Sequence, residues 1–439
     1  MGFSLRGVHL PHRKNTANMP AVSLATPKSV VLPTVMHIGK PAKPVVKVGD
    51  HVDVGTLVAE QDGFISSPVY ASISGTVTKI ADTLLSNGTM VPAITIEGDG
   101  EMTPDPALVP PVVTDRASFI EAVRQSGIVG LGGAGFPTYV KLATDKPIEM
   151  LIINGAECEP YITSDTRTMI DRVEDMERGL IALEEHLGIT NVIIAVENNK
   201  KEAIASMKKL AADDAYVNVK VLPSLYPQGG EKVLIYHTTG KKVGAGMLPI
   251  DVGCIVLNCS TVAAIGSYLK TGMPLVERTI TIDGGAVVAP QNVIAPIGMI
   301  LEEVFAACGG FKEDPVKVLY GGPMMGIAVP DLGVPVLKNT NALLALTEKE
   351  NDPIHETPCI RCGACARHCP FGLRSQAIAR ANKLEDLDML KKLQVETCME
   401  CGCCAFVCPA NRPLIQSNRI AKAKLREAAA KQKAKEGSK

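Results

Sequence analysis

Two runs of four cysteines near the carboxyl end of the chain share one spacing, C-x2-C-x2-C-x3-C-P. The first run is Cys359, Cys362, Cys365 and Cys369, and the second is Cys398, Cys401, Cys404 and Cys408. In this motif, three thiolates of one run hold one [4Fe-4S] cluster, and the fourth cysteine ligates the other cluster. The predicted ligand sets are therefore Cys359, Cys362 and Cys365 with Cys408, and Cys398, Cys401 and Cys404 with Cys369.

Zinc is the alternative occupant, because paired C-x2-C motifs also form structural zinc sites. Zinc sites need neither the third cysteine of each run nor the Cys-Pro ending, so we predict two [4Fe-4S] clusters that carry single electrons. Cys403 fits no ligand position and is expected to be a bystander. Thirteen cysteines in a chain of this size, most of them in one cluster, favour metal ligation in a reducing cytoplasm over disulfides.

A glycine-rich loop at residues 128–138 is the second chemical feature. Gly130, Gly132 and Gly135 match G-x-G-x-x-G. A helical segment precedes the loop and Pro137 follows it, so the context of an ordinary dinucleotide fingerprint is missing. Bare backbone N–H groups can still wrap a phosphate, and Lys141 could add a positive charge. Alone, the loop leaves a nucleotide role open.

Three further polar groups lie beside apolar segments that predict strands: residues 154–160, 226–232 and 257–261. The first follows Met150–Ile153 directly. Sheets of the α/β class bind ligands at the carboxyl ends of their strands. Together with the glycine loop, these groups favour one binding site over several unrelated turns.

The composition of the whole chain limits the functions that these residues can have. Its 439 residues are 46% hydrophobic, enough for several packed domains. With 45 basic and 46 acidic side chains it shows no excess of positive charge, so we expect no nucleic-acid partner. The apolar runs are far shorter than the roughly 20 residues of a membrane-spanning helix, and the first residues do not form a secretory signal.

The elements predict a multidomain α/β and α+β protein. Residues 1–105 read as a β-sandwich like those of biotinyl and lipoyl carriers, although no lysine between Gln61 and Thr78 could accept a cofactor. Residues 106–272 alternate strands with the helices 117–125, 172–187 and 201–212, which predicts a largely parallel sheet. Residues 273–346 form a small α+β module, and 347–418 form the cysteine domain, with helical spacing over 375–393.

The last segment, residues 419–439, has eight basic residues against Glu427 and Glu436, a net charge of +6. We expect a solvated helix there, with contact to anionic lipid or an acidic partner as the alternative.

The order Gly-Gly-Ala-Gly-Phe-Pro-Thr, Asn-Gly-Ala-Glu-Cys-Glu-Pro, Gly-Gly-Glu and Asn-Cys-Ser-Thr resembles the NADH-binding flavoprotein of respiratory complex I. With the N-terminal β-sandwich and the twin cysteine motifs, the chain is most similar to the C subunits of Rnf ion-translocating electron transport complexes. This resemblance spans the chain from about residue 7 through Asn411. It implies a Rossmann-like FMN/NAD(H) domain, a soluble-ligand-binding β-grasp module and a helical two-cluster ferredoxin-like domain.

The resemblance also implies roles for particular residues. Those expected to hold or line non-covalent FMN are Gly130, Gly132, Gly133, Gly135, Lys141, Asn154, Glu157, Tyr226, Gly229, Gly230, Asn258 and Thr261. Those expected to face the nicotinamide of the substrate NAD(H) are Phe136, Glu159 and Glu231. Leu131, Ala156 and Cys158 depart from the complex I pattern, and this chain has two cluster motifs where the complex I flavoprotein has one.

The implied activity is electron transfer between ferredoxin and NAD+, in either direction, within a membrane-bound complex. Clusters carry one electron and nicotinamide accepts a hydride, so a flavin is needed between them. Expected partners are iron-sulfur and membrane subunits of the complex, with ferredoxin acting indirectly and the chain peripheral at the cytoplasmic face of the bacterial inner membrane. Alternatives left open are a cobalamin-reducing flavoprotein of bacterial microcompartments, a diaphorase subunit of a soluble hydrogenase or formate dehydrogenase, and a non-enzymatic iron-sulfur relay scaffold.

Overall fold

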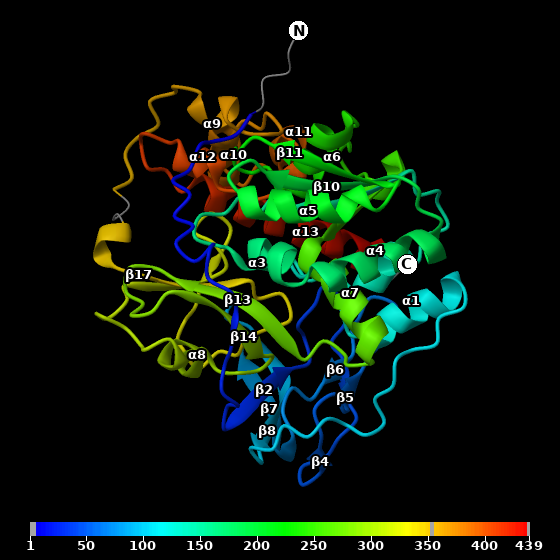
Figure 1. Ribbon diagram of the computed structural model, residues 1–439. Helices are drawn as coiled ribbons and strands as arrows, with labels where there is room; N and C mark the ends of the chain where they lie inside the picture. The colour runs from blue at the N-terminus through cyan, green and yellow to red at the C-terminus, as the bar shows by residue number, and fades with distance from the viewer. Residues whose placement is uncertain (1–5, 352–354, 437–439) are drawn as a thin grey trace. The chain divides into compact units, whose positions relative to one another are not determined.

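The computed structural model describes residues 6–351 and 355–436, which form two units. One unit, called here the sheet unit, comprises residues 12–222 and 253–351. The other, called the cysteine unit, comprises the described residues of 1–11, 223–252 and 352–439. Figure 1 labels the elements of both. Each unit is therefore assembled from segments that lie far apart in the sequence.

The N-terminal part of the sheet unit is a β-sandwich. Its larger sheet has the order β2 (Ser29–Pro33), β8 (Met90–Gly98), β7 (Gly75–Leu84), β4 (His51–Val52), all antiparallel. Its smaller sheet has the order β3 (Lys43–Pro44), β5 (Leu57–Glu60), β6 (Val69–Tyr70). Alternate residues of β2 and β8, including Val30, Leu32, Ile94 and Ile96, are fully buried. This alternation of buried and exposed residues is the one expected for strands with one face on a core.

The middle of the sheet unit is a four-stranded parallel sheet with the order β11 (Val217–Leu222), β10 (Val192–Glu197), β9 (Met150–Gly155), β12 (Cys254–Asn258). Its helices are α1 (Arg116–Gln125), α2 (Thr138–Leu142), α3 (Ser164–Asp171), α4 (Val173–Leu187), α5 (Lys201–Ala212) and α7 (Cys259–Thr271). Helices α4 and α7 approach closely at Gly266, where a Cβ would lie 1.9 Å from the Asp175 carbonyl oxygen. The predicted parallel sheet and helix 201–212 are present, whereas α3 was not anticipated.

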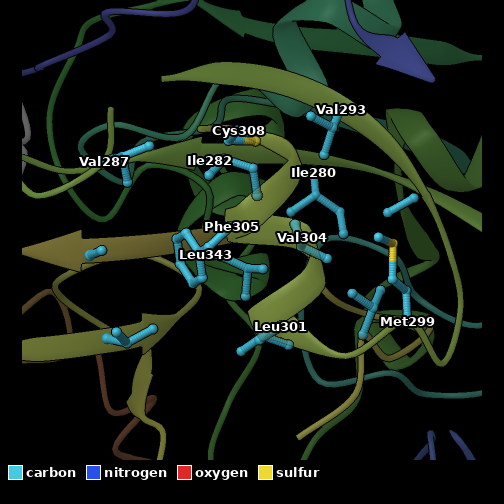
Figure 2. Close-up of a cluster of buried hydrophobic side chains, with 14 of the residues drawn as sticks. Ile280, Ile282, Val287, Val293, Met299, Leu301, Val304, Phe305, Cys308 and Leu343 are labelled. Atoms are coloured by element: carbon cyan, nitrogen blue, oxygen red, sulfur yellow. The ribbon is translucent and has the colours of Figure 1, made fainter. Parts of the chain in front are cut away.

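The third part of the sheet unit is a mixed sheet with the order β1 (Val22–Ser23), β14 (Gln291–Pro296), β13 (Glu277–Asp283), β17 (Ala342–Leu346), β15 (Lys317–Tyr320), β16 (Ile327–Ala328). Helix α8 (Leu301–Ala307) packs on it, and the 3-10 helix η2 (Glu348–Glu350) follows the last strand. Figure 2 shows Val304 and Phe305 of α8 among the buried side chains of β13. The predicted α+β module is present, and its sheet also includes β1, a strand from the N-terminal segment that pairs with β14.

The cysteine unit is helical. Its elements are α6 (Glu231–Thr239), η1 (Pro249–Val252), α9 (Ala364–Arg367), α10 (Ser375–Lys383), α11 (Leu387–Lys392), η3 (Val395–Thr397), α12 (Cys403–Phe406) and α13 (Leu414–Glu436). Its core joins Ile378, Leu390 and Val395 to Ala421 and Leu425.

Both helical expectations about the cysteine unit are confirmed, each with a difference in detail. The helical spacing over 375–393 belongs to two helices, because Glu385 has a φ of 56° and Asp386 starts α11 by accepting a hydrogen bond from Met389 N. The basic segment is helical, but only one face of it is solvated: Ile420 is 51% exposed, whereas Ala421 is fully buried and Leu425 is 3% exposed, because the face of α13 that carries these two packs on α10 and α11. Helical periodicity alone cannot reveal either a local break or a distant packing partner.

Candidate functional site

The glycine loop is a closed turn at the start of α2. Gly130 N donates to Phe136 O at 2.8 Å, and Thr138 N donates to Ile128 O at 3.2 Å. Gly132 and Gly133 are exposed. A Cβ on Gly132 would lie 2.4 Å from Asn258 Nδ2, whereas one on Gly133 would meet nothing within 4 Å. The loop therefore lies against the end of β12 and presents bare backbone, as a phosphate or flat ring requires.

Asn154 and Asn258 end two neighbouring strands at the point where the strand order reverses. β9 pairs with β10 on one side and with β12 on the other, and Asn258 is the register partner of Asn154. The crevice outside the carboxyl ends of strands at such a switch point is the ligand site of open α/β sheets. The structure thus brings the glycine loop together with two of the three polar groups, those at Asn154 and Asn258, whereas the group at 226–232 belongs to the cysteine unit.

Asp165 organises this sheet edge, although sequence analysis did not single it out. Its carboxylate accepts hydrogen bonds from Asn258 Nδ2 and Ser260 Oγ, both at 2.7 Å. Asn258 Oδ1 in turn caps α7 by accepting from Ser260 N at 2.9 Å. Thr261 Oγ1 accepts from Leu131 N at 3.1 Å. Thr261 therefore holds the glycine loop to α7.

Glu157 turns its carboxylate toward the start of α3. The carboxylate accepts hydrogen bonds from Asp165 N at 2.7 Å, from Thr166 N at 3.3 Å and from Thr166 Oγ1 at 2.5 Å. Lys14 Nζ lies 3.7 Å from Glu157 Oε2. Burial raises the pKa of Glu157 and lowers that of Lys14 to about 8. In this arrangement Glu157 caps a helix, so its predicted place beside the flavin stays a prediction.

Lys14 is a second residue that sequence analysis missed as part of the site. Its ammonium donates to Glu157 O at 2.8 Å, to Glu159 O at 2.9 Å and to Ile162 O. Nothing in the local sequence of the N-terminal segment indicates this role, because the three acceptors lie more than a hundred residues away. Lys14 fixes the loop that carries Glu157 and Glu159.

Arg278 supports the glycine loop from the β-grasp module. It is 4% exposed, and it donates to Leu131 O at 3.1 Å and to Thr340 O at 3.2 Å. Burial lowers its pKa to about 10. Lys141, predicted to hold phosphate, donates to Val256 O in β12 at 3.2 Å and thus lies beside the same strand.

The segment Tyr226–Glu231 belongs to the cysteine unit. Tyr226 pairs with Val8 through backbone hydrogen bonds of 2.8 and 3.0 Å, and its hydroxyl donates to Cys401 O at 2.8 Å. A Cβ on Gly230 would lie 2.2 Å from Met399 Cε. Gly229 is half-buried and Glu231 begins α6. A segment that the family resemblance assigns to the flavin therefore contacts the second cysteine motif.

The two cysteine motifs have the same backbone conformation. Arg361 and Glu400, each between the first two cysteines of its run, have φ values of 55° and 62°, and Gly363 and Gly402 have 75° and 78°. Each run thereby curls its first three thiols around a hollow, and the third of these thiols lies in a short helix, α9 or α12.

Each hollow collects thiols from both runs. The first is lined by Cys359, Cys362, Cys365 and Cys408. The second is lined by Cys369, Cys398, Cys401 and Cys404, with the buried Cys403 beside them. Within the described residues, no three His, Cys, Asp or Glu side chains converge tightly enough for a single metal ion. The four thiols around each hollow come from both runs, as the crossed ligand pattern of two [4Fe-4S] clusters requires.

Four family models match the chain in sequence. They are the RnfC barrel sandwich hybrid domain at residues 3–101, the Nuo51 FMN-binding domain at 123–267, the SLBB domain at 279–328 and the 4Fe-4S dicluster domain at 352–409. These matches confirm the predicted fold class and the prediction of FMN and [4Fe-4S] cofactors.

Among curated relatives, the C subunit of the Na(+)-translocating ferredoxin:NAD(+) oxidoreductase complex of Acetobacterium woodii is 40% identical over 95% of this chain and 96% of its own length. The chain belongs to the family of Rnf complex C subunits. The proton-translocating counterpart from Clostridium ljungdahlii is also 40% identical, over 85% of this chain and 83% of its own length. The C subunit of an ion-translocating oxidoreductase complex from Rhodobacter capsulatus is 40% identical over 97% of this chain and 84% of its own length.

A solved NAD+-reducing [NiFe]-hydrogenase in the air-oxidized state has a similar fold. The likeness has a TM-score of 0.51 at 20% identity and covers 71% of this chain and 63% of that chain. At this identity it bears on fold alone. Among the helices of residues 6–351 and 355–436, none has the length and apolarity needed to cross a bilayer.

Proposed function

We propose that this member of the Rnf family passes electrons between NAD(H), FMN and two [4Fe-4S] clusters as the peripheral nucleotide-reactive part of a ferredoxin:NAD+ oxidoreductase complex. The observation that carries the proposal is the contact between Tyr226 and Cys401 O, which links a flavin-assigned segment to a cluster motif. Bound FMN supplies the conversion between hydride transfer and single-electron transfer. The chain's own residues bind and orient the cofactors.

In the sheet unit, the glycine loop and the paired strand ends are the proposed FMN site. The open side of Gly133 leaves room for the cofactor, and Asn154 and Asn258 lie side by side at the edge of the sheet next to it. Thr261 and Arg278 hold Leu131 from two sides, so the loop is preorganised for binding. Preorganised donors bind a cofactor without an ordering cost at the moment of binding.

In the cysteine unit, we assign the crossed ligand sets to the two hollows: Cys359, Cys362, Cys365 and Cys408 to the first, and Cys398, Cys401, Cys404 and Cys369 to the second. The second ligand set contacts the segment of Tyr226 and Gly230, which the family resemblance assigns to the flavin. We therefore assign to the cluster of this set the exchange of electrons with FMN. In the first hollow, Cys359 and Cys362 are exposed and Ile360 is 67% exposed. This cluster is the one that a partner protein of the complex reaches.

The partners follow from the family. The complexes named for the relatives use ferredoxin and NAD+, so we assign to this chain the exchange with an iron-sulfur subunit on one side and NAD(H) on the other. Ion translocation belongs to membrane subunits of the complex. We place the chain at the cytoplasmic face of the bacterial inner membrane, because ferredoxin and NAD(H) are cytoplasmic.

Anaerobic reconstitution of the chain tests this proposal. We expect about eight irons per chain, since two [4Fe-4S] clusters are proposed, together with bound FMN whose absorption near 450 nm, a property common to oxidised flavins, bleaches on addition of NADH. Asn258→Leu is expected to lower FMN content while leaving iron content unchanged, because Asn258 is remote in sequence from the cysteine motifs. Full iron with no FMN and no response to NADH would instead support the relay-scaffold alternative.

A further inference from the structure

The loop between β15 and β16, residues 321–326, holds the side chain of Glu159. Met324 N donates to Glu159 Oε2 at 3.0 Å, and Met325 N donates to Glu159 Oε1 at 2.9 Å. Gly326 N closes the loop by donating to Gly322 O at 2.8 Å. Successive backbone N–H groups that converge on one anion form a nest, a recurrent carboxylate- and phosphate-binding arrangement.

Gly322 is required at this loop because of Glu159. A Cβ there would lie 2.3 Å from Glu159 Oε2 and 2.5 Å from its Cδ. Gly322 does not have a positive φ, so the backbone itself would accept alanine. The space that a side chain at residue 322 would fill is taken by the carboxylate. Substitution therefore displaces Glu159 without changing its chemistry.

We infer that the β15–β16 loop of the β-grasp module is a positioning element for Glu159, and that this module thereby takes part in NAD(H) recognition. The inference rests on the proposed function and on the role that the family resemblance implies for Glu159, which is to face the nicotinamide. Lys14 fixes the backbone of Glu159 through its carbonyl oxygen. The loop fixes the other end of the same residue. Because both the backbone and the carboxylate of Glu159 are held, the side chain presents one orientation to the substrate, which lowers the entropic cost of binding.

Gly322→Ala tests the inference against Gly333→Ala as the matched control. Gly333 lies in the same module, is exposed, and has no positive φ; its Cβ would meet the Asp331 carboxylate at 2.9 Å instead of Glu159. With ferricyanide as acceptor, we expect G322A to raise KM for NADH about tenfold, as the loss of one hydrogen bond to a charged group does. Its kcat should stay within about twofold of wild type, with FMN and iron content unchanged. G333A should match wild type in every parameter.

Glu159→Asp provides a second variant that leaves the loop sequence intact. A side chain one methylene shorter keeps the charge but cannot reach both amides. We expect E159D to raise KM as G322A does, and the double variant to cost no more than the larger single effect, because both act on one contact. Additive effects would show that Gly322 acts elsewhere.

Hydrogen exchange at the Met324 and Met325 amides supplies a readout that does not depend on activity. In the protein without NADH, we expect both amides to exchange faster in E159D than in wild type, and G333A to leave them unchanged. If wild type fails to oxidise NADH, the proposed function is wrong while the exchange result still tests the contact. If wild type oxidises NADH but G322A and E159D keep its KM, the positioning role is refuted.

Discussion

Lys14→Met removes the charge that fixes the loop of residues 157–162. The ammonium donates to three carbonyl oxygens of this loop and lies 3.7 Å from Glu157 Oε2. Methionine keeps most of the apolar stem and loses every one of these hydrogen bonds. We predict that K14M lowers the free energy of unfolding and also lowers FMN content, because the loop borders the proposed flavin site.

The burial of the pair sets the size of the effect. The side chains of Lys14 and Glu157 are 15% and 2% exposed, so the substitution leaves a buried carboxylate without its cation. Removing one partner of a buried ion pair costs about 3–5 kcal/mol. Glu157 keeps its hydrogen bonds from Asp165 and Thr166, which favours the lower end, about 3 kcal/mol. With a urea m-value of about 1–3 kcal/mol/M, the midpoint falls by about 1–3 M.

Anaerobic urea denaturation followed by circular dichroism measures this midpoint. The control is the double variant K14M/E157Q, which has no unpaired buried carboxylate and should therefore be more stable than K14M alone. A K14M midpoint equal to that of wild type would refute the reasoning. So would a double variant that loses the sum of the two single effects.

Three further predictions follow from other contacts. Lys338 is fully buried with its Nζ on Ser67 Oγ, Pro68 O and Gly127 O, and burial lowers its pKa to about 7. Between about pH 7 and pH 10.5, Lys338 is protonated in the unfolded chain but not in the folded one. The free energy of unfolding, measured from denaturation midpoints, should therefore rise with pH by about 1 kcal/mol per pH unit relative to K338M in that window. K79M, which removes an exposed lysine, should show the same pH dependence as wild type. Cys408→Ser should lower the iron content toward about four atoms per chain, because it removes a ligand of the cluster in the first hollow. Iron analysis measures the content, and electron paramagnetic resonance shows which cluster is lost. Loss of the second cluster's signal instead would contradict the crossed assignment. Thr261→Val should weaken FMN binding about tenfold in fluorescence titration, because Leu131 N loses its acceptor; Thr271→Val, at the exposed end of the same helix, should not.

The family, the cofactors and the order of the parts were predictable from sequence because their signals are local. The cysteine spacing is a property of two short loops, and the structure curls both in the same way around their hollows. Asn154 and Asn258 lie at the carboxyl ends of β9 and β12, after apolar residues, and parallel strands bring these ends to one edge. Helix α5 has the predicted bounds because its apolar spacing is uninterrupted.

Long-range partners could be read only from the tertiary structure. Lys14 lies 148 residues before its acceptor Ile162, and Asp165 lies 93 residues before its donor Asn258. Strand β1 joins β14 although more than 260 residues separate them, which only the register shows. The Met324 and Met325 amides hold Glu159 through backbone N–H groups, which every residue except proline possesses, so no residue type marks the contact. Residue types and spacing determined which cofactors the chain serves, whereas contacts between distant segments decided how its side chains are held, because a buried polar group takes whichever partner the fold brings near.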